Sequence, residues 1–404
     1  MIRTILAAAS LSLLMSAGAQ AACAFRNEVP LKSLTGSFEA WKAVTGAMNE
    51  CGNVQAELDA NFRQKQPPAF AANPSLYHIG GVANGTLTPL MNAGTIRPLD
   101  DLVAKYGQNL SPNQLIRNDG RIMAVAMMVN SQHLMYREDI LQELGIPAPK
   151  TWDDVLAAAE KIKASGKLQY PLSGTYKAGL DLALEFINMY LGFGGQFTKA
   201  DNTPAVNSEA GLKSLAMLKR ISGYMDPEYL VADSTYVQKQ FQQGKIAMAN
   251  LWASRAAALD DPKESQVVGK VAMAAAPLAM AGGKPATTMW WDGIVVAKNI
   301  KDAEAEAAFR VAMEGIDTEM VKANNDTAVW LIKGFEPGRF AKGVVASAMG
   351  GAPNYPSTTA MGLMQTALGE RLPDFMTGKA TAEQTLAAIE ASYLARAREQ
   401  GLVR

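Results

Sequence analysis

The sequence predicts an α/β fold in which a mostly parallel β-sheet carries helices on both faces. From Glu28 onward, short apolar segments typical of strands alternate with amphipathic segments typical of helices. Residues 122–129 form a continuous apolar run of the length expected for a buried strand. The 404 residues are enough for two domains with a large core.

The individual elements follow from apolar periodicity and from turn residues. In the first part of the chain we expect strands at 29–34, 54–58, 76–79 and 122–129, and helices at 38–50, 87–93 and 99–106. Farther along we expect helices at 180–191, 208–221, 236–243, 303–314 and 382–399, and strands at 246–250, 267–275 and 294–297. Between them, Pro147 and Pro149 hold an extended link, and Thr151 with Asp154 forms a capping-box-like start for another helix.

The N-terminus has the pattern of a secretory signal peptide over residues 1–21. Arg3 precedes an apolar segment at 5–15, and Ala19-Gln20-Ala21 gives a cleavage site of small residues. A buried N-terminal helix is the alternative. Cys23 invites a lipid-anchor interpretation, but the large apolar residue expected three positions earlier is missing. We therefore expect an exported, periplasmic protein without a lipid anchor.

The two cysteines, Cys23 and Cys51, could pair in an oxidising compartment. If a strand at 29–34 is followed by an antiparallel helix at 38–50, the end of that helix returns toward the start of the strand. This would bring Cys51 near Cys23. Two free thiols remain the alternative, and a metal site would need more ligands than these.

Composition and motifs argue against several classes of function. Basic and acidic residues are equal at 38 each, which disfavours bulk nucleic-acid binding and a polybasic membrane surface. The two histidines, His78 and His133, are far apart, and we find no zinc-protease, nucleophile-elbow or phosphate-loop motif. We therefore predict no catalytic residues, no cofactor and no metal. A hydrolase built on two distant carboxylates stays open.

Aromatic residues stand at the ends of expected elements and are candidates for ligand contact. Trp252 follows a strand directly, Trp290 and Trp291 precede one, and Tyr176 and Tyr355 lie in turn-rich segments. Ligands of doubly wound domains bind beyond the strand ends, and aromatic faces suit the C–H faces of sugars. Core packing is the alternative. Because successive strand residues face opposite ways, only one of Trp290 and Trp291 should face a given surface.

Several segments resemble the sugar-binding family of bacterial extracellular solute-binding proteins, which includes maltose-binding protein and serves ATP-binding-cassette (ABC) importers. Residues 136–154 carry the pattern Tyr-x-x-Asp-x-Leu-x-x-x-Gly-Ile-x-x-Pro-x-Thr-Trp-x-Asp. Segments 241–252, 292–309 and 375–386 resemble further stretches of the family in the same order and spacing. The first 100 residues match weakly.

The resemblance implies two α/β lobes that close on a ligand between them. The N-terminal lobe would comprise residues 22–129 and 292–328, and the C-terminal lobe 130–291 and 329–404. The chain would cross between them near 129–131, 288–292 and 326–331. The implied partners are a small carbohydrate and the membrane permease of an ABC importer, with no nucleic acid, and the protein would be a monomer.

The resemblance also assigns ligand contacts by position. The N-terminal lobe would supply Ser37, Glu39 and Asn84, the first crossing Asn130, the other lobe Tyr176, Trp252 and Tyr355, and the second crossing Trp290, Trp291 and Asp292. The carboxylates of Glu39 and Asp292 would accept charge-assisted hydrogen bonds from sugar hydroxyls, although Glu39 could instead support the start of a helix. The alternatives to a carbohydrate binder are a secreted carbohydrate-active enzyme and a binder of a sugar acid, a sulfonated sugar or a polyamine.

Overall fold

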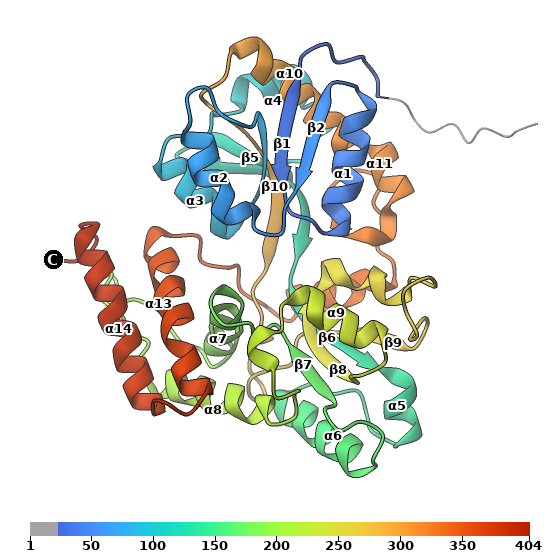
Figure 1. Ribbon diagram of the computed structural model, residues 1–404, viewed down its shortest axis with the longest axis vertical. Helices are drawn as coiled ribbons and strands as arrows, with labels where there is room; N and C mark the ends of the chain where they lie inside the picture. The colour runs from blue at the N-terminus through green and yellow to red at the C-terminus, as the bar shows by residue number, and fades with distance from the viewer. Residues whose placement is uncertain (1–22) are drawn as a thin grey trace, which may run out of the picture.

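The computed structural model describes residues 23–404, which form two lobes one above the other (Figure 1). Each lobe is built on its own mixed sheet with helices packed against it. The predicted signal peptide at 1–21 lies outside the described residues. Among residues 23–404, none of the helices combines the length and the apolar character needed to cross a membrane.

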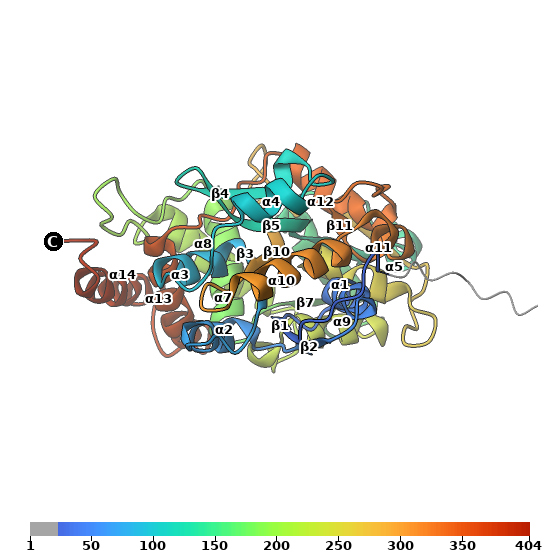
Figure 2. The same cartoon turned by 90° about the horizontal axis from the view of Figure 1, so that it is seen from above.

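The strands are β1 (Leu31–Thr35), β2 (Val54–Leu58), β3 (Ile79–Ala83), β4 (Leu115–Asn118), β5 (Arg121–Asn130), β6 (Gln132–Arg137), β7 (Leu172–Gly174), β8 (Met248–Trp252), β9 (Val271–Ala274), β10 (Trp290–Val296) and β11 (Val329–Trp330). The α-helices are α1 (Glu39–Glu50), α2 (Phe62–Ala71), α3 (Asn84–Asn92), α4 (Asp100–Tyr106), α5 (Glu138–Glu143), α6 (Trp152–Ala164), α7 (Leu180–Gly192), α8 (Glu209–Ser222), α9 (Ser234–Gln242), α10 (Asp302–Gly315), α11 (Thr318–Ala323), α12 (Lys342–Met349), α13 (Thr359–Met376) and α14 (Ala382–Glu399). Seen from above, α13 and α14 stand at one side of the molecule (Figure 2).

The first sheet has the order β11-β5-β10-β3-β1-β2, with β4 also paired to β5. Among residues 23–404, the parallel pairs of this sheet are β1–β2 and β1–β3. Strand β10 lies between β3 and β5 and runs antiparallel to both, and β4 and β11 run antiparallel to β5. The prediction of a mostly parallel sheet was therefore wrong. Strand β10 enters this lobe from the other one, so it must run opposite to the strands whose carboxyl ends point toward that lobe.

The second sheet has the order β7-β8-β6-β9, with β7–β8 as its parallel pair. The chain passes between the sheets directly after β5, where only Ser131 separates β5 from β6. It returns at the start of β10 and leaves again after β11, whose residue Trp330 still pairs with Met128 in the first sheet. These connections leave the facing ends of the two sheets close to each other.

Gly80 and Gly81 explain why the third strand was predicted at 76–79, whereas β3 lies at Ile79–Ala83. They were expected to end a strand at Ile79, but they lie inside β3. The ring of Phe70 occupies the place of a side chain at Gly80, and the ring of Trp41 occupies the place of one at Gly81, with an added Cβ only 2.7 Å from ring carbons in both cases. Each glycine thus lets an aromatic ring pack directly on the sheet.

Helix α2 was not expected. Pro67 and Pro68 lie inside it, and each removes a helical hydrogen bond. Phe62 and Phe70 nevertheless bury against the sheet and hold the helix in place. Elsewhere the expected elements are present within a few residues, and β2 and α14 have the predicted bounds. The capping box of α6 is confirmed, with Thr151 and Asp154 exchanging hydrogen bonds of 3.1 and 2.9 Å.

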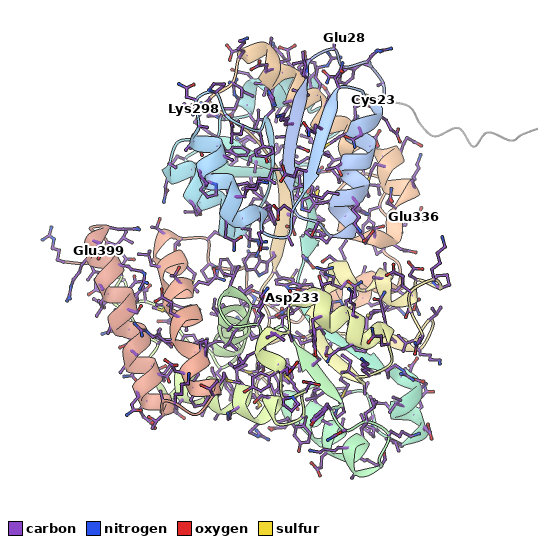
Figure 3. All side chains as sticks on the ribbon, in the orientation of Figure 1. Cys23, Glu28, Asp233, Lys298, Glu336 and Glu399 are labelled. Atoms are coloured by element: carbon purple, nitrogen blue, oxygen red, sulfur yellow. A yellow bond between two sulfur atoms is a disulfide. The ribbon has the colours of Figure 1, made fainter. Side chains whose placement is uncertain are left out.

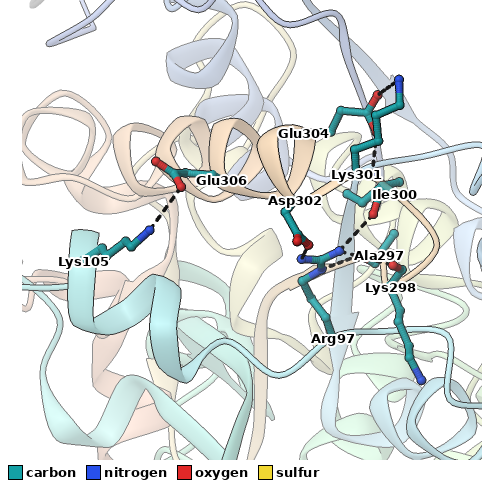
Figure 4. A network of polar contacts seen from close by, with 9 residues as sticks. All are labelled: Arg97, Lys105, Ala297, Lys298, Ile300, Lys301, Asp302, Glu304 and Glu306. Carbon is teal, nitrogen blue, oxygen red and sulfur yellow. Dashed lines mark hydrogen bonds and ion pairs between the residues drawn. The ribbon is translucent and has the colours of Figure 1, made fainter.

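The turn from β10 to α10 is held by one arginine (Figure 4). The Arg97 guanidinium donates hydrogen bonds to the carbonyl groups of Ala297, Lys298 and Ile300 and forms a 3.0 Å ion pair with Asp302. Arg97 therefore fixes the end of β10 away from the other lobe, while the start of β10 faces it.

The predicted pairing of Cys23 with Cys51 is confirmed by a disulfide between them. It ties the segment before β1 to the end of α1, where Cys51 is buried.

We expect the double substitution Cys23→Ala and Cys51→Ala to lower the free energy of unfolding by about 2–4 kcal/mol, because the closed loop restricts the unfolded chain. Chemical denaturation followed by circular dichroism measures this loss. Wild-type protein in reductant is the control and should behave like the double variant. Equal stability of oxidised wild type and double variant would contradict a structural role for the disulfide.

Candidate ligand-binding cleft

A cavity of about 330 Å³ lies between the lobes and draws its walls from both. The first lobe contributes the segments after β1 and β2 and the ends of β3 and β5, and the second lobe contributes the segments after β7 and β8 and the start of α9. Loops beyond the carboxyl ends of strands are where α/β sheets usually bind ligands. Asp233, at the start of α9, lies on the side of the second lobe that faces the first (Figure 3).

Aromatic rings form one wall of the cleft. Trp290 and Trp252 meet edge to face with ring centroids 5.8 Å apart, and Tyr355 packs behind Trp290 at 4.2 Å. The indole nitrogen of Trp290 donates a 2.8 Å hydrogen bond to Thr288, so this polar atom is already satisfied inside the protein. The wall therefore offers an apolar surface of the kind that packs against a sugar or polyol carbon chain.

Charged side chains of both signs surround the aromatic wall. The cations are Arg63 of the first lobe and Lys177 and Arg255 of the second, and the carboxylates are Asp292 of the first lobe and Asp181 and Asp233 of the second. Lys177 and Asp233 pair at 3.5 Å, and Asp233 also caps α9 through the backbone amides of Thr235 and Tyr236. The cleft-lining groups carry equal formal charge of each sign.

Asp292 is the most deeply buried of these carboxylates, with 5% of its surface exposed. No residue among 23–404 donates a hydrogen bond to its carboxyl group. Burial raises its pKa to about 6, and the nearby Arg63 guanidinium acts in the opposite direction. The side chain lines the cavity, so a ligand can supply the missing donors.

Asp181, Arg255 and Arg63 add to this polar surface. Burial raises the pKa of Asp181 to about 6, against the opposing charge of Arg63. Burial also lowers the pKa of Arg255, which donates a 3.1 Å hydrogen bond to Gln238. The Nε atom of Arg63 is buried without a partner among residues 23–404. These groups are costly to bury as they stand and gain from a polar ligand.

Five of the sequence-predicted site residues line the cavity: Ser37, Asn130, Trp252, Trp290 and Asp292. Asn130, at the end of β5, is also joined to the segment after β8. Its amide nitrogen donates to Ser254 Oγ at 3.2 Å, and its amide oxygen accepts from the Ser254 backbone nitrogen at 3.4 Å. The structure therefore brings together the polar loop after β1, the first connection and the second connection.

The other five predicted residues do not line the cavity. Glu39 is exposed on α1 and pairs with Lys42 at 2.6 Å. Asn84 donates to the Met289 carbonyl at 3.3 Å, and Tyr355 lies behind Trp290. Tyr176 is buried in the core of the second lobe with its ring edge against Tyr229, and Trp291 packs into the opposite, apolar side of the first sheet.

Sequence reasoning missed most of the charged lining, namely Arg63, Lys177, Asp181, Asp233 and Arg255. Arg63 lies in the unexpected helix α2, and Arg255 follows the strand expected at 246–250. The other three lie just before or within segments that were assigned as helices without regard to their side chains. The rule that ligands bind beyond strand ends could have found Arg63, because the strand before it, β2, was predicted with its observed bounds.

Comparisons with known proteins agree with this architecture. Residues 33–314 match the family described as bacterial extracellular solute-binding protein. A probable ABC transporter-binding protein of Deinococcus radiodurans is 29% identical over 283 residues, which cover 66% of this chain and 65% of that protein. An sn-glycerol-3-phosphate-binding periplasmic protein of Agrobacterium fabrum is 30% identical over 173 residues, which cover 34% of this chain and 38% of that protein. The chain thus spans less than two thirds of the length of either relative.

The fold also has a solved counterpart. An ABC transporter solute-binding protein from Agrobacterium radiobacter, solved in complex with ribitol, has a TM-score of 0.79 at 22% identity, covering 92% of this chain and 99% of that one.

The two sheets, their connections and the cavity between them define a two-lobed binding protein. Because the family match covers more than half of the chain, the protein belongs to the bacterial extracellular solute-binding protein family. Members of this family are substrate-binding proteins of transport systems rather than enzymes.

We expect Asp292→Asn to stabilise the ligand-free protein at about pH 7.5 by on the order of 1–3 kcal/mol and to have little effect near pH 4.5. The pKa of Asp292 is about 6 in the folded protein, above that of an unfolded aspartate, so the native state holds this proton more tightly. The wild-type protein therefore loses stability as pH rises from the pKa of an unfolded aspartate toward about 6. Asparagine carries no charge at either pH and removes this loss. Thermal unfolding at both pH values measures the effect.

The matched control is Asp119→Asn, at an exposed turn position with φ of 49° that either residue tolerates. This control should leave the thermal stability nearly unchanged at both pH values. Destabilisation of the ligand-free protein by Asp292→Asn at the higher pH would contradict the account of this carboxylate.

Proposed function

We propose that this protein is the periplasmic substrate-binding protein of an ABC importer and that it captures a neutral carbohydrate or polyol. The composition of the cleft supports this function. An aromatic wall from Trp252 and Trp290 lies beside the unpartnered Asp292 carboxylate and side chains of both charges from the two lobes. Carboxylates accept hydroxyl hydrogens and guanidinium groups donate to hydroxyl oxygens, so this lining suits a ligand with many hydroxyl groups.

The balance of charge favours a neutral ligand over a charged one. Each of the three cations in the cavity wall is matched by a carboxylate, so neither an anion nor a cation would meet a surplus of opposite charge. The glycerol phosphate bound by the Agrobacterium fabrum relative is an anion. It would bring its phosphate near Asp181 and Asp292 here as well as near Arg63.

The lobes supply the means of capture. Within residues 23–404, three connections join them, and a hinge motion about these segments closes the lobes on a ligand that binds both. Hydrogen bonds from Thr88 to Ser357 and from Asn92 to Thr359 already join α3 of the first lobe to the start of α13. The closed, ligand-bound form would be the one delivered to the membrane permease, with the protein acting as a monomer and without catalysis.

The test is a thermal-shift screen of the chain from Ala22 onward against ribitol, mannitol, maltose, galacturonate, glycerol-3-phosphate and spermidine. A ligand at about 100 times its dissociation constant stabilises the protein by roughly 2.7 kcal/mol. We expect a response to a neutral sugar or polyol, with the compound recovered unchanged. A response to charged compounds alone would overturn the neutral ligand, and consumption of the compound would overturn the binding role.

For the neutral ligand found in this screen, we expect Asp292→Asn to weaken binding by about tenfold or more, since a charge-assisted acceptor is lost. Isothermal titration calorimetry at about pH 7.5 measures the change, with Asp119→Asn as the control of unchanged affinity. Wild-type affinity in Asp292→Asn would show that the ligand does not use this carboxylate.

A further inference from the structure

A chain of buried hydrogen bonds runs from the aromatic wall of the cleft into the second lobe. The Trp290 indole donates to Thr288 Oγ1 at 2.8 Å, and Thr288 donates to Asn188 Oδ1 at 2.9 Å. Asn188 Nδ2 donates to Gln132 Oε1 at 2.5 Å, and Gln132 Nε2 donates to Glu185 Oε1 at 2.7 Å. No member of this chain is more than 6% exposed.

The chain has one direction, because its two ends have fixed roles. An indole nitrogen can only donate and an ionised carboxylate can only accept. Thr288 must therefore accept from Trp290 and pass its own hydrogen to Asn188, which fixes the orientation of the Asn188 and Gln132 amides. Thr175 joins at the acceptor end, where its hydroxyl group also donates to Glu185. Glu185 is thus the final acceptor for the whole chain.

The chain connects the segments that link the lobes. Gln132 begins β6 directly after the first connection, and Thr288 and Trp290 belong to the second. Glu185 and Asn188 lie on α7, which stands beside these connecting segments (Figure 1). Asp181, four residues before Glu185, lies on the same side of α7 and lines the cavity. One helix therefore holds both connections and also carries a cleft residue.

We propose that Glu185 is a positioning residue for ligand binding, which holds the Trp290 ring in its cleft-facing orientation through Gln132, Asn188 and Thr288. The proposal rests on the proposed function, in that Trp290 is taken to contact the ligand. Glu185 itself does not line the cavity, so its effect on a ligand must pass through the chain. A residue that only stabilised the core of the second lobe would not affect Trp290 in particular.

The titration of Glu185 gives a way to observe this link without ligand. Burial raises the pKa of Glu185 to about 7, while the hydrogen bonds from Thr175 and Gln132 act in the opposite direction. The other titratable groups facing it are Asp181 and the buried Tyr176. Protonation weakens the carboxyl group as an acceptor, and the hydrogen bonds that end on it should weaken in turn.

The first experiment is nuclear magnetic resonance of the ligand-free protein with ¹⁵N-labelled tryptophan, in which six indole signals are expected. Trp290→Phe identifies the signal of Trp290. We expect this signal to shift with a midpoint near pH 7 in wild type and at a lower pH in Asp181→Asn, since the Asp181 charge contributes to the raised pKa of Glu185, but not to shift in Glu185→Gln. A Trp290 signal independent of pH in wild type, or one that still titrates in Glu185→Gln, would overturn the proposal.

The second experiment compares affinities for ribitol, or for the neutral sugar with the largest thermal shift. Gln132→Ala breaks the chain, and Gln242→Ala removes another buried glutamine that donates to the Ala258 carbonyl outside it. We expect binding to weaken about tenfold in Gln132→Ala and to stay within about twofold in Gln242→Ala, at similar losses of thermal stability. Equal affinities would overturn the positioning role.

Two substitutions of Glu185 separate its role as an acceptor from its charge. Glu185→Gln keeps an acceptor oxygen and should retain affinity within about threefold, whereas Glu185→Leu should lose about tenfold. Equal affinity of Glu185→Leu and wild type would also overturn the proposal. If wild type binds none of the probes, the proposed function fails, and the resonance experiment alone decides the role of Glu185.

Discussion

The position of the cleft depends on the direction of strand β10. It enters the first sheet between β3 and β5 and runs antiparallel to both, so its first residues lie beside the carboxyl ends of its neighbours. Those ends are where the loops of an α/β sheet gather around a ligand. Because β10 arrives from the second lobe, Trp290 and Asp292 lie between the lobes, and the same strand both connects the lobes and lines the cavity.

A cost in stability accompanies this arrangement. Asp292 and Asp181 are held where burial disfavours their charged forms, and part of the Arg63 guanidinium is buried without a partner among residues 23–404. Such groups lower the stability of the ligand-free protein and strengthen the binding of a ligand that supplies their missing hydrogen bonds. A binding site differs from a core in this respect. The aromatic wall, held from behind by Tyr355, supplies contact area that needs no such compensation.

Local signals in the sequence predicted local structure well. The capping box at Thr151, the bounds of α14 and the return of Cys51 to Cys23 depend on residues close together in the chain. The direction of β10 and the packing of aromatic rings on Gly80 and Gly81 depend on contacts between distant segments. Sequence patterns therefore predicted a mostly parallel sheet and a third strand that ends at Ile79, and both predictions were wrong. Half of the predicted site residues line the cavity, and the charged residues opposite them come from segments that only the fold brings together.

A ligand held by both lobes should depend on side chains of each, and calorimetric titration of two variants measures this dependence. Arg63→Ala removes a polar group of the first lobe, and Trp252→Ala removes an aromatic ring of the second. If the ligand lies between the lobes, each variant should bind the neutral ligand of wild type about tenfold more weakly or worse. Wild-type affinity in either variant would place the ligand on one lobe alone and would contradict capture by closure.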